Sequence, residues 1–505
     1  MPKKKLIRII AIVLAVLLAG GVVFGALFSA LAEQPTEVGA SGRHQYDLTM
    51  EYMADEQALH ITQRLVYCNG SGRRLDAVVF YAAGNMFRRE STLMYDGDAL
   101  EKVFFAGYAP AGIDLRSVHC DEKPTDFGFQ GEGETYLRVD CAVDPGKRCT
   151  FEFDYYLLLM RGGAFQGVGD TDVRLSAFCF VPGVLNAETG QFDMKKPLAF
   201  TRWLDCEAGD YRATLALPVG WAACATGGAE KASEADGVAL WRIAADDVRD
   251  FALSFGRRWR EETRQSASGV QVRALTNVRG AAGRVLDVAV DAIDRCEVWF
   301  GDFPVRTLTF AQSDDPLENQ VFTGVVWLPT DLLAAGHADG LAQRIRFAVA
   351  QQIFGLSAWV EPSADAWLSD SVCEYVACML LEAASGRDRF LAYVNRDWVS
   401  ALQQTVPGGL HITSDAALFD ERTYDLVVRQ RGAVVMHELR LAMGLDGLVA
   451  GLRAFRELGR DGRMLTERDF VNALDAATGE SWEAFLTDWL FNVGDYVEQD
   501  MTWYE

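Results

Sequence analysis

Two acidic side chains that are spaced one helical turn apart could contribute to a metal site. Asp370 and Glu374 are four positions apart, so a helix through them would present both carboxylates on one face. Together with a distant histidine, His337 or His411, the pair could improvise a metal site. Two acidic residues on a helix are more commonly a solvated face. The spacing alone therefore predicts no bound metal.

The histidines do not form a conventional zinc motif. A zinc hydrolase of the HExxH type needs two histidines four positions apart on one helix, a glutamate between them to activate water, and a glutamate from the next helix. This chain has six histidines, at positions 44, 60, 119, 337, 411 and 437, and no two of them are four apart. A relocated HExxH motif is excluded.

Other catalytic chemistries find little support in the sequence. No GxSxG nucleophile elbow and no Walker-type glycine loop occurs. Cys373 could pair with His411 or His437 as a nucleophile and its base, but a buried core thiol is the commoner fate of a cysteine. The formal net charge of -23 argues against nucleic-acid binding, because phosphate contacts need a basic face.

Two segments resemble known zinc-peptidase signatures. Residues 347–355 read FAVAQQIFG, and residues 367–375 read WLSDSVCEY. They are similar to the HExxHQWFG and WLNEGFAEY signatures of the membrane alanyl aminopeptidase family, the aminopeptidase N-like gluzincins. The flanking tryptophan, leucine, phenylalanine, glycine and tyrosine positions agree, whereas the metal-binding types are almost all replaced.

The resemblance assigns each lost role to a position in this chain. The first histidine ligand corresponds to Phe347, the general-base glutamate to Ala348, and the second histidine to Gln351. The distal glutamate corresponds to Asp370, which alone keeps a carboxylate. We therefore expect no zinc and no other cofactor.

Further segments extend the resemblance across the chain. Residues 317–329 resemble the family's GAMEN-type strand, in which the glutamate that holds the substrate amine corresponds to Val321. Residues 429–440 resemble the YxKGAxVLHMLR helix, whose oxyanion-stabilising tyrosine corresponds to Arg429, and Tyr424 is where some relatives keep a second cleft tyrosine. His437 matches a helix residue of the family, not a ligand, and we expect a structural role for it.

The residues expected to line a cleft are Val321, Ala348, Asp370, Glu374, Tyr424 and Arg429. A carboxylate left at the floor of a cleft without zinc would be an uncompensated buried charge, which is costly. We therefore expect Arg429 or Arg346 to approach Asp370 within ion-pair distance.

The periodicity of apolar residues predicts the strands and helices that position these residues. Residues 44–257 alternate apolar and polar types in short runs, which predicts antiparallel strands in a β-sandwich-like domain. The charged stretch from 257 to 270 reads as a boundary. Residues 270–505 predict a thermolysin-like, mainly helical domain, so the fold class is multi-domain α+β. Candidate helices span 285–300, 341–354, 366–384, 427–443, 445–458, 467–478 and 482–491.

The N-terminus predicts membrane targeting. Lysines 3 to 5 and Arg8 precede an uncharged apolar run from Ile9 to Ala32, which exceeds the roughly 20 residues needed to cross a bilayer. Residues 1–33 are thus expected to form a single-pass anchor with the body outside the cytoplasm. The alternative is a signal peptide cleaved after Ala30-Leu31-Ala32, followed by secretion.

Ten cysteines occur without any CxxC pair. An extracytoplasmic location permits disulfides, and Cys120, Cys141 and Cys149 lie close enough in sequence to pair locally, but the sequence leaves the connectivity open.

These observations favour a membrane-anchored, extracytoplasmic pseudo-peptidase that has lost zinc and binds peptides or a protein partner without hydrolysing them. The alternative is an active metallo-aminopeptidase-like hydrolase with an unconventional metal set. A third interpretation is a structural interaction module with no functional cleft.

Overall fold

The computed structural model describes residues 42–89, 101, 104, 107–163, 165–186, 189–194, 206–314, 320–361, 364–406 and 408–496. The chain divides into two compact units, Met1–Gly42 and Arg43–Glu505. The expected anchor or signal segment at residues 1–33 lies outside the described residues. Within the described ranges, no helix is both long enough and apolar enough to cross a bilayer.

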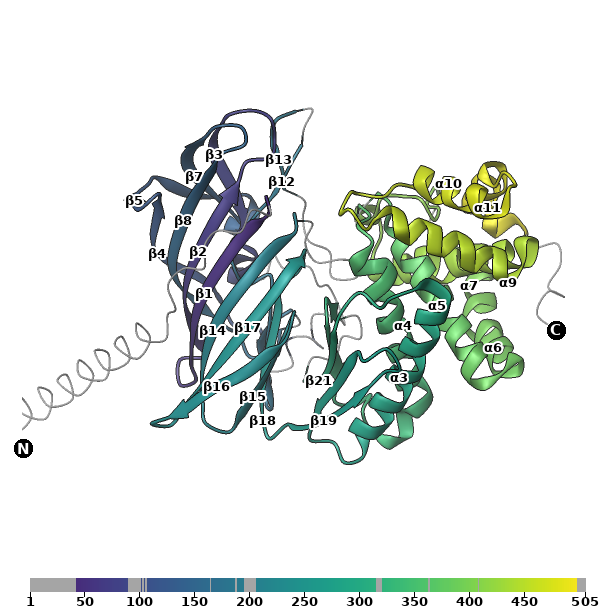
Figure 1. Cartoon of the computed structure of the whole chain (residues 1–505), viewed down its shortest axis with the longest axis horizontal. Coiled ribbons are helices and arrows are strands. Elements are labelled where there is room, and N and C mark those ends of the chain that lie inside the picture. The colour runs from purple at the N-terminus through teal and green to yellow at the C-terminus, as the bar shows by residue number, and fades with distance from the viewer. Residues whose placement is uncertain are drawn as a thin grey trace, which may run out of the picture. The chain divides into compact units, whose positions relative to one another are not determined.

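The first half of the second unit is built on an eight-stranded sheet of order β16-β17-β14-β1-β2-β8-β4-β5, whose long strands run side by side in Figure 1. In that order, its strands are β16 (Ala229–Ala235), β17 (Val238–Val248), β14 (Gly209–Pro218), β1 (His44–Met53), β2 (Ala58–Cys68), β8 (Arg148–Leu158), β4 (Gly112–Cys120) and β5 (Lys123–Pro124). β1 shows strict alternation of more and less buried residues, as the sequence predicts for a half-buried strand.

Three smaller sheets complete this β-rich region. One has the order β15 (Trp221–Ala225), β18 (Ala252–Arg257), β10 (Asp172–Ser176) and β9 (Gln166–Val168); the next has β11 (Val181–Pro182), β3 (Leu75–Tyr81), β7 (Tyr136–Val143) and β6 (Phe127–Gln130); the last pairs β12 (Val184–Leu185) with β13 (Phe192–Asp193). Aromatic and aliphatic side chains from these sheets and the large one form a shared core.

One pairing departs from the antiparallel expectation. β1 is antiparallel to β2 but parallel to β14. Parallel neighbours need a long crossover, and here the chain between residues 53 and 209 supplies it. A two-residue alternation of side chains cannot distinguish these two pairings, because both bury every second residue.

The second half opens with a five-stranded sheet of order β19-β20-β21-β23-β22. Its strands are β19 (Arg260–Gln265), β20 (Gln271–Thr276), β21 (Thr307–Ser313), β22 (Val321–Phe322) and β23 (Val325–Pro329). The polar stretch read as a boundary contains β19, an edge strand whose six residues are all exposed. Charged side chains are a common feature of such edges.

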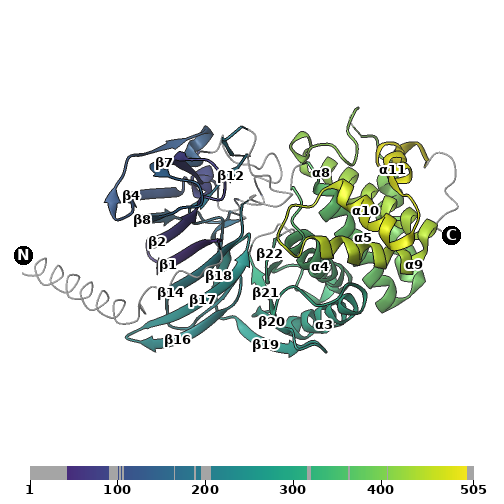
Figure 2. The same ribbon diagram turned by 45° about the horizontal axis from the view of Figure 1, so that its top comes forward.

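Helices dominate the rest of the described chain (Figure 2). They are α3 (Ala281–Phe300), α4 (Ala338–Gln351), α5 (Ala366–Ser385), α6 (Arg387–Val394), α7 (Ser400–Leu402), α8 (Glu421–Tyr424), α9 (Gly432–Leu458), α10 (Glu467–Thr478) and α11 (Glu483–Tyr496). Apolar residues of β20, β21 and β23 share one core with α3, α4, α5 and α9.

The helix boundaries agree well with the periodicity, with instructive exceptions. The predicted break between residues 443 and 445 is present, because Gly444 within α9 has φ 79° and ψ 164°. Three π-helical segments, Gln352–Ser357, Asn395–Val399 and Asp425–Arg431, directly follow α4, α6 and α8. Such segments are frequent near functional sites.

Candidate functional site

The helices α4 and α5 bring together the positions at which the resemblance places zinc ligands. Phe347 is only 4% exposed and Ala348 is fully buried, and both belong to the apolar core. The guanidinium carbons of Arg344 and Arg429 lie 5.4 and 5.3 Å from the centroid of the Phe347 ring. The aromatic ring therefore interacts with two cations where a histidine would hold one.

Gln351 and Gln352 differ in their surroundings. The Oε1 atom of Gln351 is buried without a hydrogen-bond partner. Gln352, by contrast, accepts from the backbone amide of Gly324 at 2.9 Å and donates to the carbonyl of Phe322 at 3.0 Å. The end of α4 is thus fastened to the β22–β23 hairpin through Gln352.

Asp370 is a buried carboxyl group on α5, 7% exposed. The hydroxyl of Tyr424 donates to its Oδ2 atom at 2.7 Å, and the Ser369 hydroxyl lies 3.4 Å from Oδ1. Burial raises the pKa of Asp370, although the nearby Arg429 charge and the Tyr424 hydrogen bond act in the opposite direction. Tyr424 is fully buried and serves as the partner of this carboxyl.

Arg429 does not form the ion pair expected from the sequence. Its Nη1 atom lies 2.8 Å from Oδ1 of Asp425, four positions earlier on the same π-helical segment. Neither Arg429 nor Arg346 comes within 4.0 Å of Asp370, so that expectation is wrong. Arg429 already has an ion-pair partner in Asp425. Asp370 receives its hydrogen bond from Tyr424 instead. Burial acts to lower the pKa of Arg429, but Asp425 and Asp370 outweigh it and the pKa is raised.

Glu374 is the second carboxyl on α5 and is 8% exposed. It accepts a 2.8 Å hydrogen bond from the Tyr393 hydroxyl of α6. Burial raises the pKa of Glu374 despite this hydrogen bond and the charge of Arg429. The acidic pair Asp370 and Glu374 is therefore buried, in contrast to the solvated face that such spacing usually marks.

A pocket of about 410 Å³ lies beside this cluster. Its walls come from α4, α5, α6 and the π-helical segments 395–399 and 425–431; the charged and aromatic side chains that line it are Asp339, Arg344, Arg346, Phe347, Glu374, Arg389, Tyr393, Arg396, Asp397, Asp425 and Arg429. Of the six residues expected to line a cleft, Glu374 and Arg429 line this pocket. Val321, Ala348, Asp370 and Tyr424 do not.

The residues at the ligand positions do not fit a zinc ion. Phe347 has no donor atom, Gln351 offers an amide in place of an imidazole, and the Asp370 carboxyl is engaged by Tyr424. Within the described ranges, the group that could hold a metal lies far away in sequence and consists of Cys120, Cys141 and Cys149.

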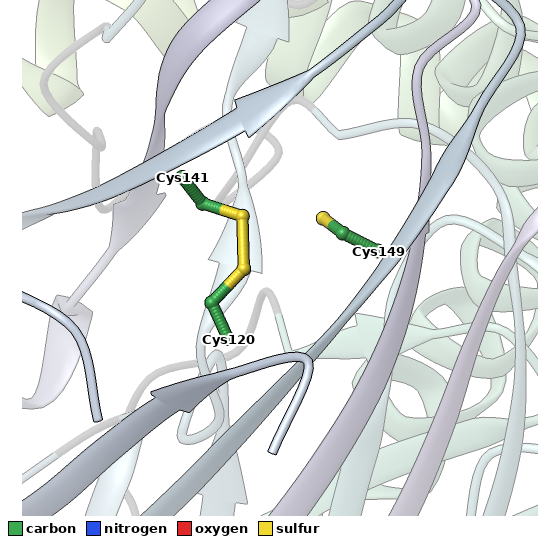
Figure 3. Close-up of side chains that lie close together, drawn as sticks. All are labelled: Cys120, Cys141 and Cys149. Carbon is green, nitrogen blue, oxygen red and sulfur yellow. A yellow bond between two sulfur atoms is a disulfide. The ribbon is translucent and has the colours of Figure 1, made fainter. Parts of the chain in front are cut away.

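That cysteine group lies in the β-rich region, where Figure 3 shows a disulfide with a third sulfur beside it. Cys120 and Cys141 are bonded to each other, which decides among the local pairings the sequence left open. Cys149 remains a free thiol, and burial raises its pKa to about 12. With two sulfurs in a disulfide, this group offers one thiol to a metal.

The histidines available to Cys373 are occupied elsewhere. His437 is buried and its Nδ1 lies 3.0 Å from the Tyr375 hydroxyl, and burial lowers its pKa to about 4, which agrees with the expected structural role. His411 pairs with Thr413 at 2.9 Å. Burial raises the pKa of Cys373 well above its ordinary value, so this thiol is not primed as a nucleophile.

Several pocket residues were missed by sequence reasoning. Tyr393 lies on α6, a short helix outside the predicted set, and Arg344 drew no attention because arginine in an amphipathic helix usually faces solvent. Both arginines at 344 and 346 are in fact less than 9% exposed. Side chains two positions apart point to nearly opposite sides of a helix, so at least one of these two arginines has to be buried when the helix packs in a core. This spacing could have indicated a buried arginine from the sequence.

Comparisons with known proteins support the fold. No family model matches this sequence. No curated protein matches it either. Among solved structures, an M1 zinc metallopeptidase from Deinococcus radiodurans aligns with a TM-score of 0.62 and 16% identity over 89% of this chain and 94% of that one. A two-domain M1 zinc metallopeptidase variant bound to L-tryptophan aligns with a TM-score of 0.63 and 17% identity over the same shares. The described chain therefore has the two-domain fold of M1 zinc metallopeptidases.

Proposed function

We propose that this protein is a non-catalytic relative of the M1 zinc aminopeptidases that binds peptides or a protein partner outside the cytoplasm without hydrolysing them. The observation that carries the proposal is Phe347, a buried ring close to two guanidinium groups at the position that the resemblance gives to the first zinc ligand. Arg344 and Arg429 would weaken the binding of a cation at this position even if a histidine stood there, because like charges repel.

The other lost roles support the same proposal. Ala348 lacks a general base, Val321 lacks a carboxylate for the substrate amine, and Arg429 has no hydroxyl for the oxyanion. Each role depends on a specific functional group, and a fold alone confers none of them. Tethering to a membrane is proposed from the apolar run between Ile9 and Ala32 and the lysines before it.

The test is a zinc and activity measurement on the full-length chain in detergent. We expect substoichiometric zinc by mass spectrometry and no chelator-sensitive release of p-nitroaniline from aminoacyl p-nitroanilides. An active M1 zinc metallopeptidase assayed in parallel is the positive control. Stoichiometric zinc together with chelator-sensitive turnover would establish the alternative, an active hydrolase with an unconventional metal set.

A second experiment tests whether zinc binding is absent only because the zinc-binding residue types are replaced. A variant carrying Phe347→His, Ala348→Glu, Gln351→His and Asp370→Glu restores the donor set on α4 and α5. We expect this variant to bind more zinc than the wild-type chain. Equal zinc content in both proteins would mean that the replaced ligand types are not what determines zinc binding, and it would remove the assay's support for the proposal.

A further inference from the structure

The pocket beside Phe347 contains a buried arginine whose charge has no direct partner. Arg346 lies in the middle of α4, lines the pocket and is 8% exposed. It forms no hydrogen bond and no ion pair within 4.0 Å with any residue in the described part of the chain. Burying a cation without a partner is costly, so its presence calls for a compensating contact.

The nearest acidic groups are already paired with other arginines. Arg346 interacts electrostatically with Asp291 and Asp339. Asp291 is bound by Arg295 at 2.9 Å, and Asp339 by Arg389 at 3.3 Å. Neither carboxylate is therefore placed to neutralise Arg346 directly.

The remaining acids of the pocket wall are also engaged. Asp397 pairs with Arg396 at 2.7 Å and Asp425 with Arg429 at 2.8 Å. Glu374 is held by the Tyr393 hydroxyl, and burial favours its protonated form. The pocket wall thus includes the buried guanidinium of Arg346, which has no hydrogen-bond or ion-pair partner among the described residues.

We propose that this pocket binds the carboxylate of a short peptide, with Arg346 as the cation that holds it. The inference rests on the proposed peptide-binding function and specifies its site. A guanidinium matches a carboxylate with two parallel N–H···O bonds. The volume of about 410 Å³ falls in the range of small-ligand pockets.

The pocket wall favours an anion that also carries an apolar side chain. Five arginines, at positions 344, 346, 389, 396 and 429, outnumber the acidic side chains of the wall, so the space attracts an anion. The rings of Phe347 and Tyr393 add apolar surface that can contact a peptide side chain. The dipeptide Ala-Phe has the size and the single C-terminal carboxylate that this geometry requires.

The test is isothermal titration of the full-length protein in detergent with Ala-Phe, its C-terminal amide and inorganic phosphate. We expect Ala-Phe to bind and the amide to bind about tenfold more weakly or worse, because a charge-assisted hydrogen bond contributes at least about 1.4 kcal/mol. Arg346→Gln should weaken Ala-Phe binding by about the same factor. The matched control is Arg389→Gln, which removes a pocket arginine that is 62% exposed and already paired with Asp339, and should change binding by less than about twofold.

Thermal melting of the unliganded variants separates a binding role from a structural one. If Arg346 is retained for a ligand, Arg346→Met removes an uncompensated buried charge and leaves the melting temperature unchanged or higher. A clear fall would mean that Arg346 supports the fold.

Four results would each overturn the inference: no Ala-Phe binding, equal binding of the dipeptide and its amide, tighter binding of phosphate, or unchanged binding in Arg346→Gln. None of these bears on zinc content or hydrolysis, so the broader proposal would stand or fall separately.

Discussion

At the scale of single residues, Asp370 is a carboxyl group in surroundings that disfavour its charge. Asp370 keeps the acidic type of the distal ligand but is buried and hydrogen-bonded to Tyr424 at 2.7 Å. Its pKa is raised by burial, so ionisation of this group opposes folding. The group therefore stabilises the folded state most below the pKa of an unfolded aspartate, and that contribution is lost as the pH rises through the raised folded value.

This linkage predicts the effect of Asp370→Asn. The amide oxygen can still accept the Tyr424 hydrogen bond, and the variant has no charge to bury. We expect it to be more stable than the wild-type chain at pH 7, with the gain shrinking toward zero as the pH falls below about 4. Urea denaturation across this pH range measures the difference. Asp76→Asn, at a side chain that is 86% exposed, should show no such trend, and a pH-independent effect of Asp370→Asn would contradict the argument.

At the scale of elements, close packing between α5 and the start of α9 fixes the position of the segment that carries Arg429. A methyl group added to Gly432 would lie 2.0 Å from the Ser371 hydroxyl oxygen. That hydroxyl donates to the Val428 carbonyl at 2.7 Å, which ties α5 to the π-helical segment Asp425–Arg431.

Gly432→Ala should therefore destabilise the protein by about 1–3 kcal/mol, the usual cost of overpacking a tight contact. Gly283→Ala is the matched control, because Gly283 lies in α3 with no atom within 4 Å of the added methyl. The control should gain about 0.5–1 kcal/mol from the higher helix propensity of alanine. Denaturation of both variants gives the comparison, and equal effects would contradict the packing argument.

The same elements show how far the sequence could predict the structure. The helical period and the two signature segments were sufficient to place α4 and α5. The Asp425–Arg429 pair has the i,i+4 spacing of a helical ion pair and could have been predicted, whereas the contact between Tyr424 of α8 and Asp370 of α5 joins residues 54 positions apart and left no local signal. The pocket could not be predicted from the sequence, because its walls come from helices about 80 positions apart in the chain.

At the scale of the whole second unit, polar contacts join the β-rich region to the sheet that opens the helical half. Asp314, at the end of β21, accepts a 2.6 Å hydrogen bond from the backbone amide of Thr171. Asp250 accepts a 2.8 Å bond from the amide of Thr323, next to β22. Carboxylates that accept backbone N–H groups form strong hydrogen bonds, so these two contacts couple the stabilities of the two regions.

Removing both contacts with Asp250→Ala and Asp314→Ala should make the two regions unfold separately. Differential scanning calorimetry is expected to show one transition for the wild-type chain and two for the double variant, because each region has a large apolar core of its own beside the smaller cluster that the two share. Asp154→Ala is the control, since Asp154 pairs with His60 within one sheet and its loss should leave a single transition. A single transition in the double variant would mean that apolar packing between the regions, and not these carboxylates, makes the unit cooperative. The two-domain body would then behave as one rigid scaffold, and a ligand bound beside α4 would stabilise the β-rich region as strongly as the helices that contact it.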